Sequence, residues 1–424
     1  MAATRLKLAL MLSYAIFAVL LNSVGTVILQ SIEFFHVDKV TASTLEGFKD
    51  LPIAIASFLV ASQLPRFGLR RGLMAGLTLA GLACLAMPLL PGFWTTRLMF
   101  LCVGVSFAVS KVAVYAFVGL MTRDSAGHAS LLNLIEGVFM VGVLSGYWLF
   151  SAFIDPARPA HWLDVYYLLA GACALAVALL ATTRFDESAA IDDGHRHDAA
   201  GDFRSMLALI AKLLTIVFIA SIFFYVLIEQ GVGSWLPTFN RELLGLSAPM
   251  SVQAASMFAV SLALGRIAAG VIVRRTGWYW LLIGCLNGMA LLILVALPLA
   301  AAHHGAVEAW RDAPVAVFVF PLIGLAMAPI YPALNSAILS AMPRREQPAM
   351  IGLIVVFSAL GGTTGSLIVG RTFAALGGTT AFYLLIGPIL CLMLLISWLR
   401  RLTRGATQAG AAEDATPGPA FPAH

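Results

Sequence analysis

The sequence predicts an all-α protein that crosses a membrane many times, and composition is the first reason. Of the 424 residues, 60% are hydrophobic and only 11% are charged, against about 25% charged residues in an average soluble protein. The mean hydropathy is +0.93. The second reason is a series of twelve apolar runs, each long enough to cross the roughly 30 Å of hydrocarbon in a bilayer. Because a helix satisfies its own backbone hydrogen bonds in lipid, we predict a polytopic protein with twelve transmembrane helices.

The expected helices follow one another in two groups of six. The first group comprises residues 8–30, 48–64, 72–91, 96–121, 129–153 and 163–184, and the second comprises 208–232, 250–273, 279–301, 313–341, 348–370 and 376–400. Pro329 and Pro332 predict a kink in the tenth helix, because proline lacks the backbone N–H that a helix requires.

A polar stretch between the two groups predicts the domain organisation. We expect an N-terminal six-helix bundle at 1–184, a cytoplasmic linker at 185–206, a C-terminal six-helix bundle at 207–402 and a disordered cytoplasmic tail at 403–424. The tail has the polar, Gly- and Pro-rich composition of a disordered segment. His195 and His197 lie beside aspartates in the linker. Since the linker has no rigid frame, we expect it to be solvated and to bind no metal.

The distribution of basic residues predicts the orientation. The termini, the linker and the loops on the same side carry 17 of the 26 lysines and arginines, and the opposite side carries seven. Short loops rich in Lys and Arg remain on the cytoplasmic side of a membrane. We therefore expect a multi-pass protein of the cell (inner) membrane with both termini in the cytoplasm. The net charge of +5 is scattered over loops, so it does not indicate nucleic-acid binding.

Two charges inside consecutive apolar runs are the first candidates for a functional site. Lys111 lies in the fourth expected helix and Glu136 in the fifth. Each such charge costs about 2.5–3.5 kcal/mol at the centre of a membrane helix, so its presence indicates function. With a rise of 1.5 Å per residue, their depths differ by roughly 3–5 Å. We expect an ion pair near a central cavity, and a purely structural pair that locks two helices is the alternative.

Other polar residues within the expected helices are candidate cavity groups. They are Glu229 beside two glycines in the seventh helix, Tyr331 and Asn335 one turn apart in the tenth, and Asn22, Tyr115 and Asn133. For each of them, hydrogen bonding between helices is an equally good explanation. A further group of charges between the first two expected helices is interpreted as solvated or as an outer gate. It comprises Glu33, Asp38, Lys39, Glu46, Lys49 and Asp50.

Two arginine-rich segments carry a resemblance to the major facilitator superfamily that covers nearly all of residues 8–402. Arg66-Phe-Gly-Leu-Arg70-Arg follows the second helix, with Pro65 where the superfamily usually has an acidic residue, and Gly265-Arg266 leads to Arg274-Arg275 after the eighth. The resemblance implies two bundles around a central cavity and a cytoplasmic gate. It implies gating roles for four residues, namely Arg66, Arg70, Arg266 and Arg274. Arg266 is expected near the cytoplasmic ends of the eighth and eleventh helices, away from the cavity centre.

A narrower resemblance is to the fucose–proton symporter family. It rests on Tyr225 to Ser234 with Glu229 in the seventh helix, on Leu132-Asn133-Leu134 in the fifth and on Tyr331-Pro332 in the tenth. Two acidic positions of that family are not matched, because Ser23 replaces an aspartate and Lys111 replaces a glutamate. The resemblance therefore implies transport but does not carry over the family's sugar and proton residues.

Together these observations favour a secondary active transporter over an enzyme. We expect it to move a small polar solute, sugar-like or an organic anion, by alternating access, with proton-coupled import and Glu136 as the coupling carboxyl. A proton-driven exporter is the alternative, and a non-transporting sensor is a weaker one. The sequence has no Gly-x-x-x-x-Gly-Lys-Ser/Thr, His-Glu-x-x-His or Gly-x-Ser-x-Gly motif, so we expect no ATP use, enzyme activity or cofactor. We expect a monomer whose partners are its solute, protons and the lipid bilayer.

Overall fold

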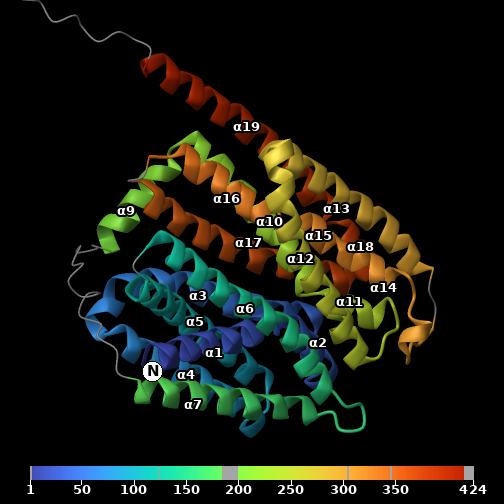
Figure 1. Ribbon diagram of the computed structural model, residues 1–424. Helices are drawn as coiled ribbons and strands as arrows, with labels where there is room; N and C mark the ends of the chain where they lie inside the picture. Colours follow the sequence, from blue (N-terminus) through green and yellow to red (C-terminus); the bar gives the residue numbers. More distant parts are fainter. Residues whose placement is uncertain (1, 123, 184–198, 303–304, 344–345, 415–424) are drawn as a thin grey trace, which may run out of the picture.

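The computed structural model describes residues 2–122, 124–183, 199–302, 305–343 and 346–414. These ranges form long, closely packed helices that run in roughly one direction (Figure 1). Eleven helices in these ranges are long and apolar enough to cross a membrane. A further 29-residue helix, α3 (Lys39–Phe67), lies among them and is less apolar because it carries charges. The predicted all-α membrane architecture is thereby confirmed.

The first half of the chain contains the helices that pack around α1 and α5. They are α1 (Ala2–Asn22), α2 (Val24–Phe34), α3 (Lys39–Phe67), α4 (Leu69–Leu89), α5 (Phe93–Met121), α6 (Ser125–Phe153), the 3-10 turn η1 (His161–Asp164) and α7 (Val165–Thr182). α1 packs on α6 and α7, while α5 packs on α3 and α4. The first expected helix is interrupted at Ser23, whose hydroxyl donates to the backbone oxygen of Leu20 at 2.8 Å.

The second half repeats this plan with more interruptions. Its elements are α9 (Ala199–Ile210), α10 (Leu213–Gly233), α11 (Leu236–Glu242), α12 (Ala248–Thr276), α13 (Trp278–Ala301), η2 (Trp310–Asp312), α14 (Ala316–Val319), η3 (Phe320–Leu322), α15 (Ile323–Met327), α16 (Ile330–Ala341), α17 (Gln347–Leu376), α18 (Gly378–Tyr383) and α19 (Ile386–Asp414). The tenth expected helix is divided into α14, η3, α15 and α16, with breaks near Pro321 and Pro329. Each proline removes a backbone donor, so the chain changes direction there.

The C-terminal tail and the linker differ from expectation. α19 continues to Asp414, past the expected start of the disordered tail at residue 403, because Ala, Thr and Gln there are compatible with a helix. α9 begins at Ala199, inside the expected linker. The two histidines of the linker, and residues 415–424, lie outside the described residues.

Three glycines with positive φ end long helices and begin the next ones. Gly68 (φ 89°) joins α3 to α4, Gly277 (φ 73°) joins α12 to α13, and Gly377 (φ 82°) joins α17 to α18. Residues other than glycine rarely adopt this backbone conformation. Gly68 lies within the arginine-rich segment of the first half and Gly277 follows that of the second, so the two halves share a similar turn as well as a sequence pattern.

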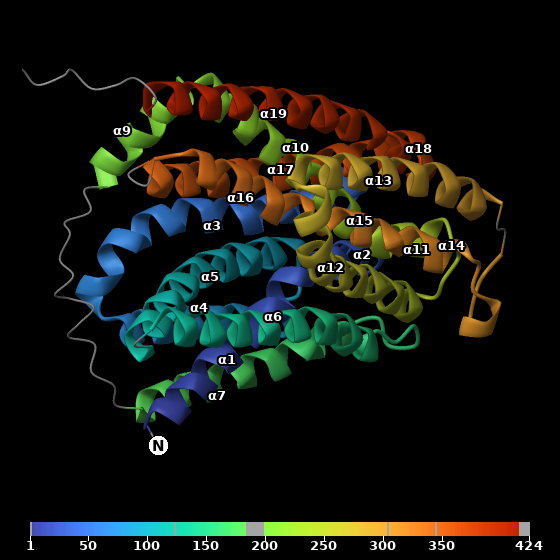
Figure 2. The ribbon, with the colours of Figure 1, turned by 45° about the horizontal axis from the view of Figure 1, so that its top comes forward.

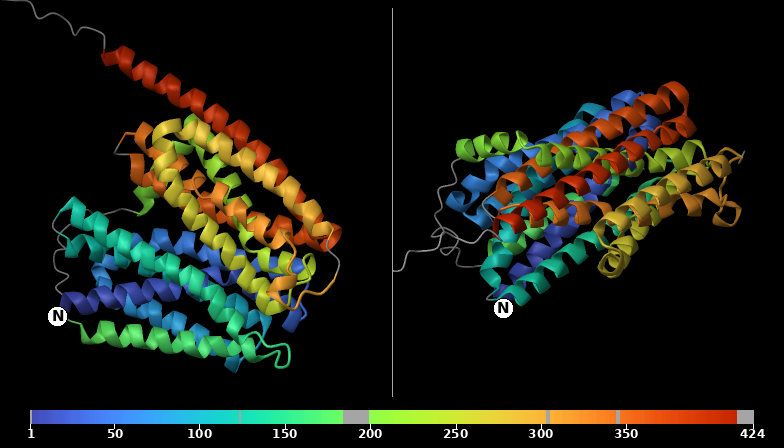
Figure 3. Two further views of the ribbon diagram at one scale, coloured as in Figure 1. Left: turned by 45° about the vertical axis from the view of Figure 1, so that its right-hand side comes forward. Right: turned by 90° about the horizontal axis from the view of Figure 1, so that it is seen from above.

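The two halves lie against each other over only part of their length. The N-terminus and α9 lie at one end of the bundle, which we call the terminal end, and α11 and α14 lie toward the opposite end, the far end (Figures 1 and 2). Contacts between the halves join α3 to α17, α2 to α11 and α6 to α12. In the left-hand view of Figure 3, the helices of the first half, coloured from blue to green, lie below most of those of the second half.

A candidate binding cavity between the two halves

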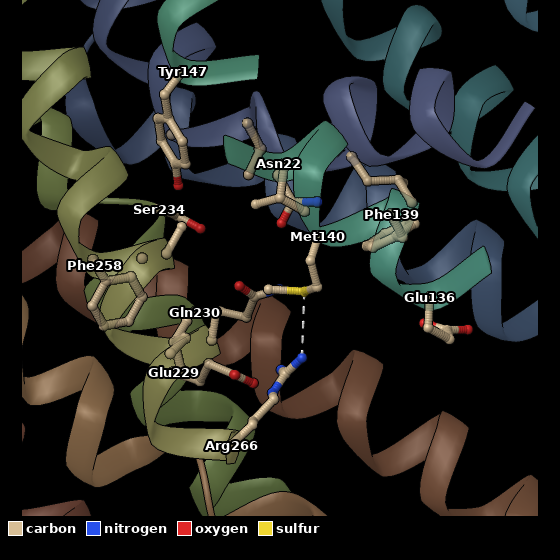
Figure 4. A pocket seen from close by; sticks show the side chains of 18 of the residues that line it. Asn22, Glu136, Phe139, Met140, Tyr147, Glu229, Gln230, Ser234, Phe258 and Arg266 are labelled. Atoms are coloured by element: carbon tan, nitrogen blue, oxygen red, sulfur yellow. Dashed lines mark hydrogen bonds between the residues drawn. The ribbon is translucent and has the colours of Figure 1, made fainter. Parts of the chain in front are cut away.

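A cavity of about 590 Å³ lies between the halves. The first half contributes side chains from α1, α2, α3 and α6, and the second contributes side chains from α10 and α12 (Figure 4). Its polar and charged lining residues are Asn22, Lys49, Glu136, Tyr147, Glu229, Gln230, Ser234 and Arg266. Ligand sites of about 300–1,000 Å³ with a few placed polar groups on an apolar wall are typical of small-molecule binding. The apolar wall here includes Phe139, Met140 and Phe258.

Polar contacts between the halves close the cavity at the far end, and we call this region the far-end seam. Glu33 of α2 pairs with Arg241 of α11 at 2.7 Å, and Lys39 of α3 pairs with Glu242 at 2.8 Å. Further contacts in it are Ser234 donating to Glu46 at 2.7 Å, Gln253 donating to Ser151 at 3.2 Å and Ser366 donating to the backbone oxygen of Ser43 at 3.3 Å. All of these contacts lie near the ends of helices opposite the terminal end.

Glu136 faces the cavity, but its partner is not the one expected. The hydroxyl of Tyr115 donates to Oε1 of Glu136 at 2.9 Å. The ammonium of Lys111 lies over the ring of Phe107, 6.0 Å from its centroid, and makes no ion pair with Glu136 within 4 Å. The Phe107 ring in turn contacts the cavity residue Phe139, with ring centroids 6.2 Å apart. Lys111 therefore lies beside the cavity, and the predicted salt bridge is absent in this conformation.

Glu229 lies in the opposite wall of the cavity and is held by its own helix. The hydroxyl of Tyr225 donates to Oε1 of Glu229 at 3.0 Å, one turn away on α10. The Tyr225 ring packs against Tyr331, with centroids 5.7 Å apart. Tyr331 thus supports the residue that positions Glu229, although it does not itself line the cavity.

Arg266 lies on the cavity wall, which corrects its expected position. Its side chain is exposed, and Nη1 donates to the Sδ atom of Met140 across the cavity at 3.6 Å (Figure 4). The sequence motif predicted a position away from the cavity centre. A motif gives the position of a residue along the helix, but it does not show which side of the helix the side chain occupies. In the structure, the face of α12 that carries Phe258, Leu262 and Arg266 is turned toward α6.

The remaining predicted site residues have separate positions. Asn22 lines the cavity and donates to the backbone oxygen of Ala18 at 2.8 Å, which helps to end α1. Asn133 is exposed on α6, and the buried Oδ1 of Asn335 has no partner among the described residues. Tyr331 lies 3.4 Å from the hydroxyl of Ser358.

Of the other three arginines expected to form a gate, Arg70 has a described contact. Its guanidinium donates to the backbone oxygen of Thr183 at 2.7 Å, which joins α4 to the end of α7. The side chains of Arg66 and Arg274 lie outside the described residues. No group of three or more potential metal ligands occurs in the part of the chain that the structure describes.

The structure places part of the charged group that follows the first expected helix inside α3, so the solvated interpretation is wrong for that part, and the outer gate stays a prediction. α3 begins at Lys39, well before the expected start at residue 48. Glu46 and Lys49 therefore both belong to this helix, and both are buried. Asp38 caps this helix by accepting a hydrogen bond from the Thr41 amide at 2.9 Å. Hydrogen bonds from the Thr41 hydroxyl and amide hold the pKa of Asp38 below its usual value. Aspartate is one of the preferred N-cap residues, so Asp38 is a signal that could have revealed this start.

Comparison with known proteins agrees with this architecture. The profile of the Major Facilitator Superfamily matches residues 8–366. No curated protein sequence matches the chain.

Several solved structures share the fold at low sequence identity. The nucleoside transporter NupG has a TM-score of 0.73 and 13% identity, over 93% of this chain and 98% of NupG. A bacterial homologue of the human lysosomal transporter Spinster, in an inward-facing and occupied conformation, has a TM-score of 0.71 and 13% identity over 96% and 97% of the two chains. The transporter FucP in its outward conformation has a TM-score of 0.58 and 17% identity over 92% and 98%. With its profile match, twelve long helices in the described ranges and central cavity, this chain belongs to the major facilitator superfamily.

Proposed function

We propose that this protein is a secondary active transporter that carries a small polar solute across the cell membrane by alternating access, coupled to protons. The observation that carries the proposal is the cavity between the halves. It takes charged groups from both halves, and the far-end seam closes it on one side only. A solute bound there contacts both halves at once, so its binding changes the relative stability of the conformations in which the halves are open or closed. Such a site at the interface of two repeats is the usual plan of secondary transporters.

We infer that this conformation faces the cytoplasm. The terminal end carries most of the basic residues, so the positive-inside rule assigns it to the cytoplasm. The far-end seam then lies on the outer side. The Spinster homologue, which is inward-facing, matches with a higher TM-score than FucP in its outward conformation, in support of this assignment. Arg66, Arg70 and Arg274 then lie at the cytoplasmic end, where we propose that they form the inner gate.

The cavity wall supports a polar solute, sugar-like or an organic anion. Asn22, Gln230 and Ser234 offer amides and a hydroxyl, and Arg266 offers a cation that has no carboxylate within 4 Å in the described part of the chain. Guanidinium groups bind carboxylates and phosphates in a fork-like geometry. The related structures include transporters of nucleosides and of xylose with protons.

For proton coupling, Glu136 with Lys111 remains the proposed site. Glu136 reaches the cavity, and Lys111 lies beside it over Phe107 without pairing. Movement of Lys111 toward Glu136 favours the ionised carboxyl, and movement away favours the protonated one. An anionic solute that engages Lys111 therefore helps Glu136 to gain a proton before the loaded carrier closes.

Purified protein in liposomes tests the proposal. Uptake of radiolabelled sugars and organic anions is measured with an inward proton gradient, with an outward gradient and with none. Accumulation against a solute gradient that depends on an inward proton gradient is the expected result. Accumulation that requires the outward gradient identifies the alternative, a proton-driven exporter. Absence of proton-dependent accumulation and of exchange for every solute, in protein shown to be folded, would contradict transport of this class.

A further inference from the structure

Three charged side chains of α3, namely Glu46, Lys49 and Asp50, lie in the far-end seam. Glu46 is 0% exposed and Lys49 is 5% exposed, and the side chain of Asp50 is 13% exposed. Lys49 donates to Oε1 of Glu46, and its ammonium lies 3.4 Å from Oδ1 of Asp50. One ammonium therefore faces two carboxyl groups in a region that water hardly reaches.

The helices packed around this cluster bring no second cation to it. α6 contributes the phenol of Tyr147, and α10 contributes the carboxyl of Glu229, both close enough to interact electrostatically with the cluster. In the described part of the chain, Glu46 and Asp50 have no ammonium or guanidinium within 4 Å other than that of Lys49. On α5, Arg97 bonds the Thr44 hydroxyl at 3.2 Å, away from the two carboxyls. Arg266 offsets the charge of Glu229. If both carboxyls were ionised, the buried cluster would keep an uncompensated negative charge.

The hydrogen bonds identify which carboxyl is the less stabilised. Glu46 has a donor for each oxygen, since Lys49 donates to Oε1 and Ser234 donates to Oε2 at 2.7 Å. Asp50 has only the longer contact of Oδ1 with Lys49. Its Oδ2 lies against α17, so close that a Cβ added to Gly362 would be 2.5 Å away from it. A largely buried carboxylate with one long contact is costly to keep ionised, whereas the neutral carboxyl avoids most of this cost.

We propose that Asp50 is a proton-binding site of the far-end seam, occupied when the seam is closed. The inference rests on the proposed alternating access. When the halves part at the far end, Asp50 leaves the glycine-lined space beside Gly362 and meets water, where it ionises. When they close, Asp50 enters this space as the neutral acid and Lys49 stays paired with Glu46. The ligand is a proton taken from the outer side, at a place different from Glu136 on α6.

A conformational measurement without any solute tests this proposal. Spin labels are attached to cysteines that replace Arg158 and Arg311, two exposed loop residues of the first and second halves at the far end, in a chain without its native cysteines. Electron–electron distance distributions are recorded in nanodiscs over a range of pH. In the parent protein, we expect the short, far-end-closed distance to gain population as the pH falls. In Asp50→Asn, we expect the closed population to depend much less on pH, because the amide cannot ionise and only groups elsewhere, such as Glu136, still titrate.

Glu33→Gln is the matched control, because it removes a carboxylate of the same seam that is partly exposed and has Arg241 as its own partner. It should keep the pH dependence of the parent. Asp50→Asn with the pH dependence of the parent would overturn the proposal.

Infrared difference spectra between high and low pH provide an independent readout of the proton. We expect the carbonyl band of a protonated, buried carboxyl in the far-end-closed parent and in Glu33→Gln, and its loss in Asp50→Asn. A closed parent protein without such a band would refute the proposal even if Asp50→Asn failed to fold. Neither measurement uses a solute, so failure here is distinguishable from failure of the proposed transport.

Discussion

The contact of α2 with α10 makes Gly25 a sharp test of the far-end seam. A Cβ added to Gly25 would lie 2.9 Å from the backbone oxygen of Ser234, 3.1 Å from that of Gly233 and 3.2 Å from Cα of Ser234. All three atoms belong to the backbone of the other half, so no side chain can rotate away to make room. Gly25→Ala should therefore destabilise the far-end-closed conformation and leave the far-end-open one unaffected.

The size of this effect follows from the clash. Overpacking by one methyl group where neighbours cannot move costs about 1–3 kcal/mol. Because the cost falls on one conformation only, it changes the ratio of closed to open by about 5–150-fold. The label pair at positions 158 and 311 reports this ratio directly, and the variant should shift the distribution toward longer distances.

Gly171→Ala is the control for the general effect of replacing glycine by alanine in a helix. Alanine favours the helix by about 1 kcal/mol over glycine. A Cβ added to Gly171 on α7 would meet nothing within 4 Å. It should leave the distance distribution unchanged. An unchanged distribution in Gly25→Ala, or an equal shift in both variants, would show that the seam does not depend on this close approach.

Three further predictions concern the cavity and are tested with the same liposomes. Glu136→Gln should bind and exchange solute but lose accumulation driven by a pH gradient, because the amide mimics the protonated acid. If this variant kept full proton-driven accumulation, the coupling site would be another residue, and Glu229 would be the next candidate. Lys111→Ala should lower the affinity for anions far more than for neutral solutes, as measured by competition, and unchanged anion affinity would leave Lys111 with a structural role. Arg266→Ala should weaken the binding of anionic solutes, because its guanidinium lies on the cavity wall; slower turnover with intact affinity would instead support the gating role inferred from its motif.

The sequence predicted the helices well where one rule dominates. Long apolar runs can only be helices in lipid, so α4, α5, α12 and α13 follow the expected spans closely. The start of α3 was predicted too late, because its first turns carry charges such as that of Glu46, which hydropathy assigns to a loop. Their burial depends on α10 and α17, which come much later in the chain. A local pattern cannot reveal partners of this kind.

The candidate site was predicted in part for a similar reason. Charges inside apolar runs indicated Glu136 and Glu229, and the structure brings both to one cavity, where Arg266 joins them although its motif predicted a position away from the centre. The pairing of Lys111 with Glu136 was inferred from depth alone. Depth does not fix the direction of a side chain around the helix axis, and in this conformation Tyr115 takes the place expected for Lys111. The motif around Arg266 likewise gave its position along the helix but not the side of the helix to which its side chain points.

The buried charges of α3 also bear on how the protein is made. Ser234, which satisfies Glu46, lies 188 residues further along the chain. When α3 leaves the ribosome, Glu46 therefore lacks this donor and keeps only its pair with Lys49 on the same helix, and charges inside the bilayer are costly. We expect α3 to remain shallow at the membrane surface until α10 and α17 are inserted, and then to slide to its final depth. Chains truncated before α10 should leave a cysteine in place of Ala42, which is 0% exposed in the full chain, open to a water-soluble thiol reagent. Equal protection in the truncated and full chains would show that α3 settles without the second half.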